Sequence, residues 1–500
     1  MNRPEREAFP DSTTAGPHPG VEPPSDRPIG LPALLCIALL ARLPAVLFAK
    51  GYQFLDQQFQ YIDPAWHLAT GDAFERTHEW TMGLRSWVYP GLLAGLFRIE
   101  RSLGVHDPET QLVLARLLQA FLSFIPVTAS WLLLTHWRPV PRARTVLLAF
   151  SCFYLSVLCG NQPNGATFAA LFSVSAVLLF HGPGFRWPFL SGLCLGLAFC
   201  GRPQDALLGP VLAAAGLLAG RRTATLALCL GSIPGILLQG FTDLATWGSF
   251  LHSPFAYLKF NLFDGRNAGW GREPLWYYPA LVLLALLILP PFVRIGLRQL
   301  LHGARILPLC FSAALTYLAL HSIPAHKAAR FVEPALLLLY LCAFLGFFHD
   351  RNPTSFRSRL HARVLFAAHL VAYLLVSFWA PARGPTEAAA MLGSQADFEN
   401  HLVLVDGSRI NVGGWFYLRR KRLAVHPVPR ERWPEAVRPL LDENAAKGLP
   451  LYLFVRKRPL DPRRAPPSIR TEEVGRFTDP FDLKRRHRVW VYRLRDRRRG

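Results

Sequence analysis

Residues 31–49 read LPALLCIALLARLPAVLFA, an apolar run that only Arg42 interrupts with a charge. A run of this length can cross a bilayer when its flanking residues help. Similar runs follow to about residue 380, and together they predict roughly eleven membrane-spanning helices. The later runs lie near 110–135, 145–160, 165–181, 188–200, 204–219, 223–240, 275–293, 306–321, 332–348 and 364–380. We therefore expect an α-helical polytopic membrane protein.

The composition supports a membrane protein. Of the 500 residues, 51% are hydrophobic and 18% are charged, whereas a soluble globular domain carries roughly 25% charged residues. The net charge of +22 fits basic loops between apolar runs better than nucleic-acid binding, because no nucleic-acid motif is present. The eight cysteines lie in or beside apolar runs without CxxC spacing, which is typical of small core residues rather than of disulfides or a zinc site.

Arginines in the short loops set the expected orientation, because basic loops stay on the cytoplasmic side. With the N-terminus inside, five arginine-bearing loops also fall inside. They contain Arg138, Arg142 and Arg144; Arg186; Arg221 and Arg222; Arg294, Arg298 and Arg305; and Arg351, Arg357, Arg359 and Arg363. This topology places the loops 51–108, 241–273 and 322–331 outside, together with the C-terminal tail.

Three regions of different character follow from these patterns. Residues 1–30 are rich in Pro, Gly, Ser and charge, a composition that predicts a disordered cytoplasmic N-terminus. Residues 31–380 form the membrane domain. Residues 381–500 contain HLVLVDG, LPLYLFVRKR and HRVWVYRLRD, which alternate or run apolar over strand length between Pro- and Arg-rich turns. They predict a small C-terminal extracytoplasmic α/β or β-rich domain.

The external loops mix acids with aromatic side chains. The loop 51–108 places Asp56 and Glu79 among Trp66, Trp80 and Trp87. A carboxylate of this kind can act as a general base, and aromatic rings can support sugar rings. The loop 241–273 has a similar mixture. The alternative for both loops is an amphipathic aromatic belt at the membrane interface, with solvated acids.

Cations concentrate where the topology does not favour them. The segment HSIPAHKAARFVEP carries His326, Lys327 and Arg330 on the external side, which predicts an anionic ligand such as a lipid phosphate. The alternative is a pair between Arg330 and Glu333. Arg202 interrupts the run 188–219, and an ionisable group at membrane depth predicts a functional site unless it simply pairs with Asp205.

Four segments, in this order, resemble the mannosyltransferases of N-glycan and GPI-anchor assembly (glycosyltransferase family 22). The first is FLDQQFQ (54–60), which is similar to the family's His-Pro-Asp-Glu-aromatic-aromatic-Gln motif through Asp56, Phe59 and Gln60. EWTMGLRSWVYP (79–90) resembles its Glu-Trp…Arg-Ser…Tyr-Pro stretch. DLATWGSF with FNLF resembles its Asp…Gly…Phe-Asn segment, and HKAARFVEP (326–334) its His-Lys-Glu-x-Arg-Phe…Pro motif. The resemblance covers about residues 31–348.

The resemblance implies a GT-C fold and an inverting transfer of mannose from a polyprenyl-phosphate-mannose donor to a glycan or glycolipid acceptor. It makes Asp56 the general base and implies no required metal or other cofactor. The cations assigned to the donor phosphate are His326, Lys327, Arg330 and Arg202. The residues assigned to substrate binding are Gln57, Gln60, Glu79, Trp80, Arg85 and Asn261.

The chain departs from the family's pattern at several positions. Phe54-Leu55 replaces His-Pro, Gln57 replaces Glu, and Ala328 replaces the Glu after His-Lys. The long tail and high Arg content favour a bacterial cell membrane and an undecaprenyl or decaprenyl carrier. Two alternatives stay open: a GT-C transferase that uses another lipid-linked sugar, such as glucose or aminoarabinose, and a non-enzymatic transporter of lipid-linked glycans. Repeated halves and discontinuous helices, which are common in transporters, are not seen in the sequence.

Overall fold

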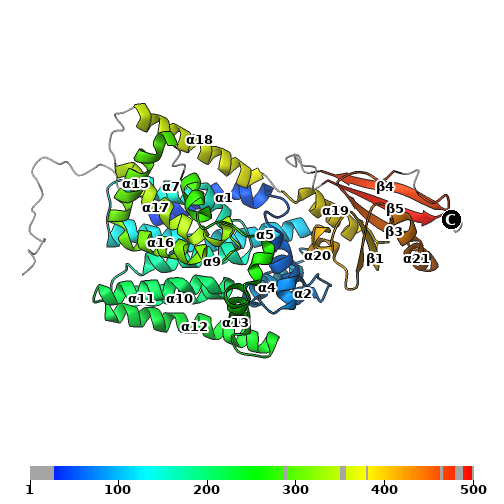
Figure 1. Ribbon diagram of the computed structural model, residues 1–500, viewed down its shortest axis with the longest axis horizontal. Coiled ribbons are helices and arrows are strands. Elements are labelled where there is room, and N and C mark those ends of the chain that lie inside the picture. Colours follow the sequence, from blue (N-terminus) through cyan, green and yellow to red (C-terminus); the bar gives the residue numbers. More distant parts are fainter. Residues whose placement is uncertain are drawn as a thin grey trace, which may run out of the picture.

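The computed structural model describes residues 28–286, 290–349, 356–378, 381–461, 465–478 and 488–497. Disorder was predicted for residues 1–30, of which residues 1–27 lie outside the described ranges. Figure 1 shows a helical part at the left and a β-sheet at the right, with α19 (Arg383–Ser394) and α20 (Trp415–Leu418) between them.

The first half of the helical part contains the predicted first span and the loop after it. Its elements are α1 (Leu31–Phe48), η2 (Gln57–Ile62), α2 (Asp63–Thr70), α3 (His78–Thr81), α4 (Val88–Ser102), α5 (Pro108–Leu122), α6 (Phe124–Leu132), η3 (Leu133–Trp137), α7 (Ala143–Cys152), α8 (Tyr154–Cys159), α9 (Gly165–Leu179), α10 (Arg186–Gly201), η4 (Pro203–Leu207), α11 (Leu208–Leu218) and α12 (Arg222–Trp247).

The second half begins with the other aromatic loop. Its elements are α13 (His252–Leu258), η5 (Lys259–Phe263), η6 (Arg266–Trp270), α14 (Tyr277–Ala285), η7 (Pro290–Phe292), α15 (Val293–Ile306), α16 (Pro308–Ser322), η8 (Ala329–Phe331), α17 (Glu333–His349) and α18 (Phe356–Phe378).

Four helical segments are long and apolar enough to span a membrane: Leu31–Phe48, Pro108–Trp137, Arg222–Trp247 and Phe356–Ser394, the last described only as α18 and α19. A fifth arises if α15 and α16, which meet at 116°, form one broken span. The bend lies at Leu307, just before Pro308, because the residue before a proline avoids helical geometry. Shorter apolar helices such as α9 and α17 fill the interior. A multi-pass membrane protein is thus confirmed, whereas the count of roughly eleven spans stays a prediction.

Glycines allow two helix pairs of the membrane part to pack at backbone distance. On α10 and α12, a Cβ at Gly192 would overlap the backbone of Leu228, and one at Gly231 would overlap that of Phe189. Gly303 on α15 meets the backbone of Cys342 on α17 in the same way. Small residues at such crossings are the usual means of helix association in lipid, where the hydrophobic effect between helices is absent. One of these helices, α10, ends just before Arg202, which lines the cavity described below.

The C-terminal part is a mixed five-stranded sheet with helices on both faces. Its remaining elements are β1 (His401–Val405), η9 (Arg409–Asn411), β2 (Ala424–Val428), α21 (Trp433–Ala446), β3 (Leu451–Arg456), β4 (Ile469–Phe477) and β5 (Val489–Asp496). The strand order is β2-β1-β3-β5-β4. β1 is parallel to β2 and β3, whereas β5 is antiparallel to β3 and β4.

Alternate residues of β1 belong to different cores. Leu402 and Leu404 join the large core that includes α19 and α20, whereas Val403 and Val405 pack with Trp433 of α21. Successive side chains of a strand point to opposite faces, so a strand covered on both faces must be apolar throughout. This explains the continuous apolar run HLVLV and confirms the small α/β unit in the tail.

Asp63 fastens the C-terminal part to the loop 51–108. Its carboxylate accepts the backbone N–H groups of Trp415 at 3.0 Å and Phe416 at 2.9 Å, and the side-chain amide of Gln58 at 2.7 Å. Burial raises the pKa of Asp63 to about 6, although these three donors oppose the rise. Gly414 allows the approach, because it has φ +134° and its missing Cβ would overlap Gln58.

We expect Asp63→Ala to lower the free energy of unfolding by about 3 kcal/mol or more, because it leaves buried donors without an acceptor. The measurement is thermal unfolding of detergent-purified protein at pH 8, where the wild-type carboxyl is ionised. Asp442→Ala is the matched control, since Asp442 lies in an exposed i,i+4 pair with Arg438, which contributes little. Equal stability of the two variants would show that this contact does not hold the two parts together.

Candidate active site

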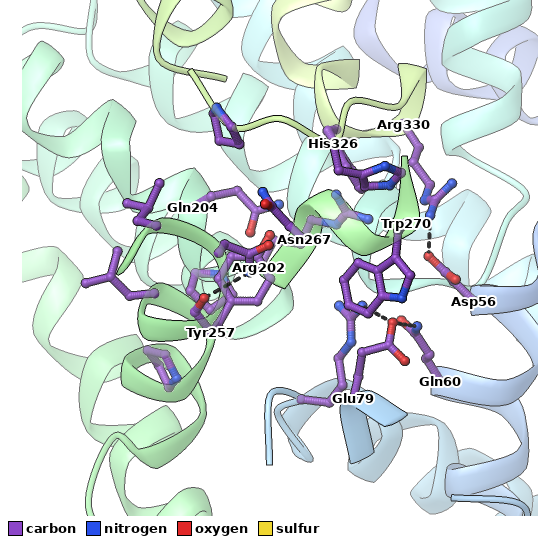
Figure 2. Close-up of a pocket in the computed structure, with 18 of the residues that line it drawn as sticks. Asp56, Gln60, Glu79, Arg202, Gln204, Tyr257, Asn267, Trp270, His326 and Arg330 are labelled. Carbon is purple, nitrogen blue, oxygen red and sulfur yellow. Dashed lines mark hydrogen bonds and ion pairs between the residues drawn. The ribbon is translucent and has the colours of Figure 1, made fainter. Parts of the chain in front are cut away.

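One cavity of about 1170 Å³ brings together segments that are far apart in the sequence. Figure 2 shows its polar side chains converging from the loop 51–108, from the region after α10, from the 241–273 loop and from the loop before α17. Eight of the eleven site residues predicted from the sequence line it: Asp56, Gln60, Glu79, Arg85, Arg202, Asn261, His326 and Arg330.

Asp56 and Arg330 form an ion pair in the cavity wall. Asp56 directly precedes η2, and its Oδ2 lies 2.8 Å from Nη2 of Arg330. The two side chains are 24% and 23% exposed, so a ligand in the cavity can reach both. The guanidinium also lies over the rings of Phe54 and Phe331, at 5.4 Å and 5.1 Å. Arg330 thus pairs with Asp56, and the alternative pairing with Glu333 is not seen among the described residues.

Glu79 is the centre of a second polar group beside this pair. Its Oε1 accepts a 2.7 Å hydrogen bond from Nε2 of Gln60 and lies 3.4 Å from Nη2 of Arg85. Arg85 is held from α12, because Trp247 donates its indole N–H to the Arg85 carbonyl at 3.2 Å. This group places a fixed acceptor and two donors at the cavity wall, which is suited to hydroxyl-bearing ligands.

A chain of hydrogen bonds from α12 fixes the loop that carries Arg85. Asp243 accepts the backbone N–H of Ser253 at 2.8 Å and its hydroxyl, and so sets the start of α13. Gln239 donates to the Ser253 hydroxyl and accepts from Ser86 at 2.6 Å. Asp243 and Ser86, two positions of the family resemblance, therefore act on the architecture of the site.

Arg202 is buried in the cavity wall and forms no ion pair with a carboxylate of the described residues, although the carboxyl groups of Asp205 and Glu333 lie near it. It is 5% exposed, and its Nε and Nη1 have no hydrogen-bond partner among the described residues. Its guanidinium lies 4.9 Å from the centre of the Phe331 ring. Asp205, the alternative partner, instead accepts hydrogen bonds from Ser173 at 2.8 Å and Tyr317 at 2.5 Å. A buried cation with unsatisfied donors is costly without a partner, so this end of the cavity suits an anionic group.

His326 lies between the rings of Trp270 and Phe331. Burial, and then the nearby Arg330 guanidinium, lower the pKa of the His326 imidazole. It is therefore neutral at pH 7. Its Nδ1 has no hydrogen-bond partner among the described residues and is available to a ligand.

Three predicted site residues do not line the cavity. Lys327 is buried, and its Nζ donates to the carbonyls of Glu273 and Pro324 at 2.9 and 2.8 Å. Gln57 is buried and accepts the backbone N–H of Gln53 at 3.2 Å. Trp80 is buried against the rings of Trp87 and Trp247. Their predicted ligand contacts stay predictions, and in this structure they support the loops that carry the lining residues.

Several lining residues were not predicted. They include Gln204, Tyr257, Asn267 and Ile410. Gln204 lies two positions after Arg202. The charge of Arg202 inside an apolar run was the sequence feature that could have indicated Gln204 as a lining residue. Ile410 comes from the C-terminal part, and no feature of its local sequence indicates a ligand site.

An apolar groove of about 500 Å³ adjoins the cavity between α11 and α16. It shares Leu207, Pro210 and Leu320 with the cavity lining. The remaining groove residues are Val211, Ala214, Ala215, Leu218, Ser312 and Thr316. The combined space is apolar at one end and bears charged side chains at the other, so it fits an amphiphile with an anionic, hydroxyl-bearing head.

Known structures share the architecture. The crystal structure of ArnT from Cupriavidus metallidurans bound to undecaprenyl phosphate aligns with a TM-score of 0.56 over 93% of this chain and 97% of ArnT, at 12% sequence identity. Its structure in the apo state gives the same values. This likeness concerns the fold alone, and it confirms the predicted GT-C fold.

Proteins of similar sequence give more specific information than the structural neighbours. GPI mannosyltransferase 3 of Drosophila melanogaster is 27% identical over 323 residues, which are 62% of this chain and 54% of the relative. GPI alpha-1,2-mannosyltransferase 3 of Xenopus laevis is 25% identical over 300 residues, 58% of this chain and 55% of the relative. The chain thus spans about half the length of the curated relatives it matches.

The family match extends beyond the four segments of the sequence resemblance. It covers residues 33–417 and therefore runs through the membrane part into α20. All the residues that line the cavity fall within this range. On this match, which confirms the family predicted from the motifs, the chain belongs to the Alg9-like mannosyltransferase family.

Proposed function

We propose that this protein transfers mannose from a polyprenyl-phosphate-mannose donor to a hydroxyl group of a glycan or glycolipid acceptor, with inversion at the anomeric carbon. The observation that carries the proposal is the convergence of the family's motif residues on one cavity, with Asp56, Glu79 and Arg330 in its wall. The names of the relatives support mannose as the sugar and a GPI-type glycolipid as one class of acceptor.

In the proposed reaction, Asp56 removes the proton of the acceptor hydroxyl. The acceptor oxygen then attacks the anomeric carbon from the face opposite the phosphate. The bond between that carbon and the phosphate oxygen breaks, and its electron pair leaves with the lipid phosphate. A β-linked donor thus gives an α-mannoside. The phosphate gains charge as the bond breaks, and fixed cations stabilise that charge most strongly in a water-poor cavity.

Arg330 has two alternative anionic partners in this scheme. In the structure it pairs with Asp56 at 2.8 Å. An entering phosphate competes for the same guanidinium and leaves Asp56 free to accept a proton. Arg202, whose Nε and Nη1 have no partner in the described part of the chain, is the second cation for the phosphate, and the neutral His326 is a hydrogen-bond partner.

The carrier and the location are further parts of the proposal. The groove between α11 and α16 can take part of a polyprenyl chain whose head group lies in the cavity. ArnT, a structural neighbour, binds undecaprenyl phosphate, which supports this class of carrier. The arginine pattern supports a cytoplasmic N-terminus, with the cavity and the C-terminal part outside. The long C-terminal part and the high Arg content support a bacterial cell membrane.

The test is transfer by the purified protein in detergent, with polyprenyl-phosphate-mannose and a panel of mannose-terminated glycolipids as acceptors. We expect an α-mannoside product and release of polyprenyl phosphate. Activity only with a glucose or aminoarabinose donor would replace mannose but keep the reaction class. If no donor were cleaved while lipid-linked glycan crossed the bilayer of proteoliposomes, the protein would be a transporter.

A further inference from the structure

The C-terminal part contributes directly to the cavity. Ile410 of η9 is one of its lining residues, although it follows the last membrane helix and the first strand of the sheet. Beside it, Nη1 of Arg409 lies 3.9 Å from Oε2 of Glu75, which also lines the cavity. The rim of the cavity is therefore shared between the loop 51–108 and the C-terminal part.

The rim segment 408–411 has a fixed shape. The side chain of Asn411 accepts the backbone N–H and the hydroxyl of Ser408, each at 3.0 Å. Before it, Asp406 is paired with Arg430 at 2.6 Å. After it, the chain enters the buried turn at Gly413 and Gly414 that leads to α20. Both ends of the segment are thus anchored, so Ile410 is held at the cavity rather than placed there by a free loop.

Hydrogen bonds also hold α20, which follows the rim segment, against the helical part of the molecule. Asp63 binds the N-terminus of α20, as described above. Arg419, at the end of α20, donates to Gln111 at 2.7 Å and lies over the Trp66 ring at 4.8 Å. The carbonyl of Arg420 accepts the backbone N–H of Ala73 at 3.0 Å. These contacts connect α20 to α5 and to the loop 51–108, so the rim segment is held against the part of the chain that carries Asp56.

The two ends of the cavity differ in chemistry. The apolar groove joins it at Leu207, Pro210 and Leu320, and α11, which carries most of that groove, lies on the side of the helical part away from the sheet (Figure 1). The rim beside Ile410 instead carries the Arg409–Glu75 pair, and Arg76 and His78, which follow Glu75 in the sequence, also line the cavity. A lipid-linked donor fits the apolar end, so the acceptor must approach from the charged end, beneath the C-terminal part.

We infer that the rim segment 408–411 is part of the acceptor site, with Ile410 contacting the apolar face of a sugar ring of the acceptor glycan and the Arg409–Glu75 pair setting the width of the entrance. This inference rests on the proposed function. It assigns to the C-terminal part a role in acceptor selection. Because aliphatic and aromatic side chains bind the C–H faces of sugars while polar groups bind the hydroxyls, Ile410 and the Glu79 group complement each other.

The test compares acceptor and donor kinetics in variants of the rim. Ile410→Ala is expected to raise the acceptor KM at least about fivefold and to leave the donor KM unchanged. The loss of one hydrophobic contact inside a closed pocket costs roughly 10- to 200-fold, and a contact at the rim is expected to contribute less. Ile410→Trp narrows the rim, so kcat/KM for a branched mannose-terminated glycolipid should fall more than that for octyl mannoside. Thermal unfolding confirms that each variant is folded.

The Arg409–Glu75 ion pair provides a second, independent test of the inference. Arg409→Glu should raise the acceptor KM by like-charge repulsion with Glu75, and the double variant Arg409→Glu, Glu75→Arg should restore it. Arg470→Glu on the exposed face of β4 is the matched control. An active enzyme whose acceptor KM is the same in all rim variants would overturn the inference and leave the proposed function intact.

A wild type without transferase activity would contradict the proposed function but still allow a decision on the rim. Titration of a mannose-terminated oligosaccharide by calorimetry measures binding without turnover. Binding that Ile410→Trp abolishes and Arg470→Glu preserves would support the rim as a glycan site. Equal binding by both variants, or none by the wild type, would overturn it.

Discussion

Asp56→Asn is expected to lower kcat for mannose transfer by about 10³-fold, within the range that a general base contributes. The amide has the shape of the carboxylate and still offers an oxygen to Nη2 of Arg330, which lies 2.8 Å from Asp56 in the structure. It cannot take the proton of the acceptor hydroxyl. The donor KM should not rise, because a neutral amide competes less strongly than the carboxylate with the donor phosphate for Arg330.

The measurement is initial-rate transfer from polyprenyl-phosphate-mannose, with Asp56→Asn, Asp56→Ala and the wild type side by side. Asp264→Asn is the control, because Asp264 lies in the loop 241–273 in a wide pair with Arg266 at 3.9 Å and does not line the cavity. It should be fully active. A fully active Asp56→Ala protein would exclude Asp56 as the base and direct attention to Glu79.

Arg330→Met is expected to lower kcat/KM for the donor by about 100-fold or more, since removing one fixed donor to a developing anion costs about 10²–10³ in rate. The methionine keeps the apolar contacts with Phe54 and Phe331 and removes the charge. Arg330→Lys should recover part of the activity, although a lysine cannot donate from two nitrogens of one planar group.

The readout for Arg330 is the donor saturation curve, compared with that of Arg266→Met. Arg266 is 58% exposed and outside the cavity, so its loss should leave the curve unchanged. Donors with a more acidic leaving group should lose less rate in Arg330→Met than the natural lipid phosphate. Unchanged donor kinetics in Arg330→Met would contradict the assignment of the phosphate to this cation.

The sequence was most informative where a property depends on neighbouring residues. Apolar runs such as Leu31–Ala49 predict membrane helices, because the cost of placing a segment in lipid is nearly a sum over its residues. The apolar run HLVLV predicted a strand, which β1 is. The motif around Asp56 and the HKAARF segment indicated the family, since each fits within a few consecutive residues.

The partners of the charged side chains depended on the tertiary structure. Arg330 is three positions from Glu333 in the sequence yet pairs with Asp56. Asp205 accepts hydrogen bonds from Ser173 and Tyr317 rather than from Arg202, three positions before it. Lys327, next to His326, turns away from the cavity toward backbone carbonyls. Each choice depends on which loops the helices bring together, and that arrangement is decided by packing across the whole chain.

The sequence by itself therefore determined the membrane class, the family and the segments from which the site is built. The tertiary structure alone decided which side chains share the cavity, that Arg202 keeps unpartnered nitrogens at its depth, and that Ile410 reaches it from the C-terminal part. The physical reason is the distance along the chain over which each property is set. Hydropathy and motifs depend on a few neighbouring residues. A cavity is formed by contacts between residues that are distant in the chain, and these contacts are fixed only when the core packs.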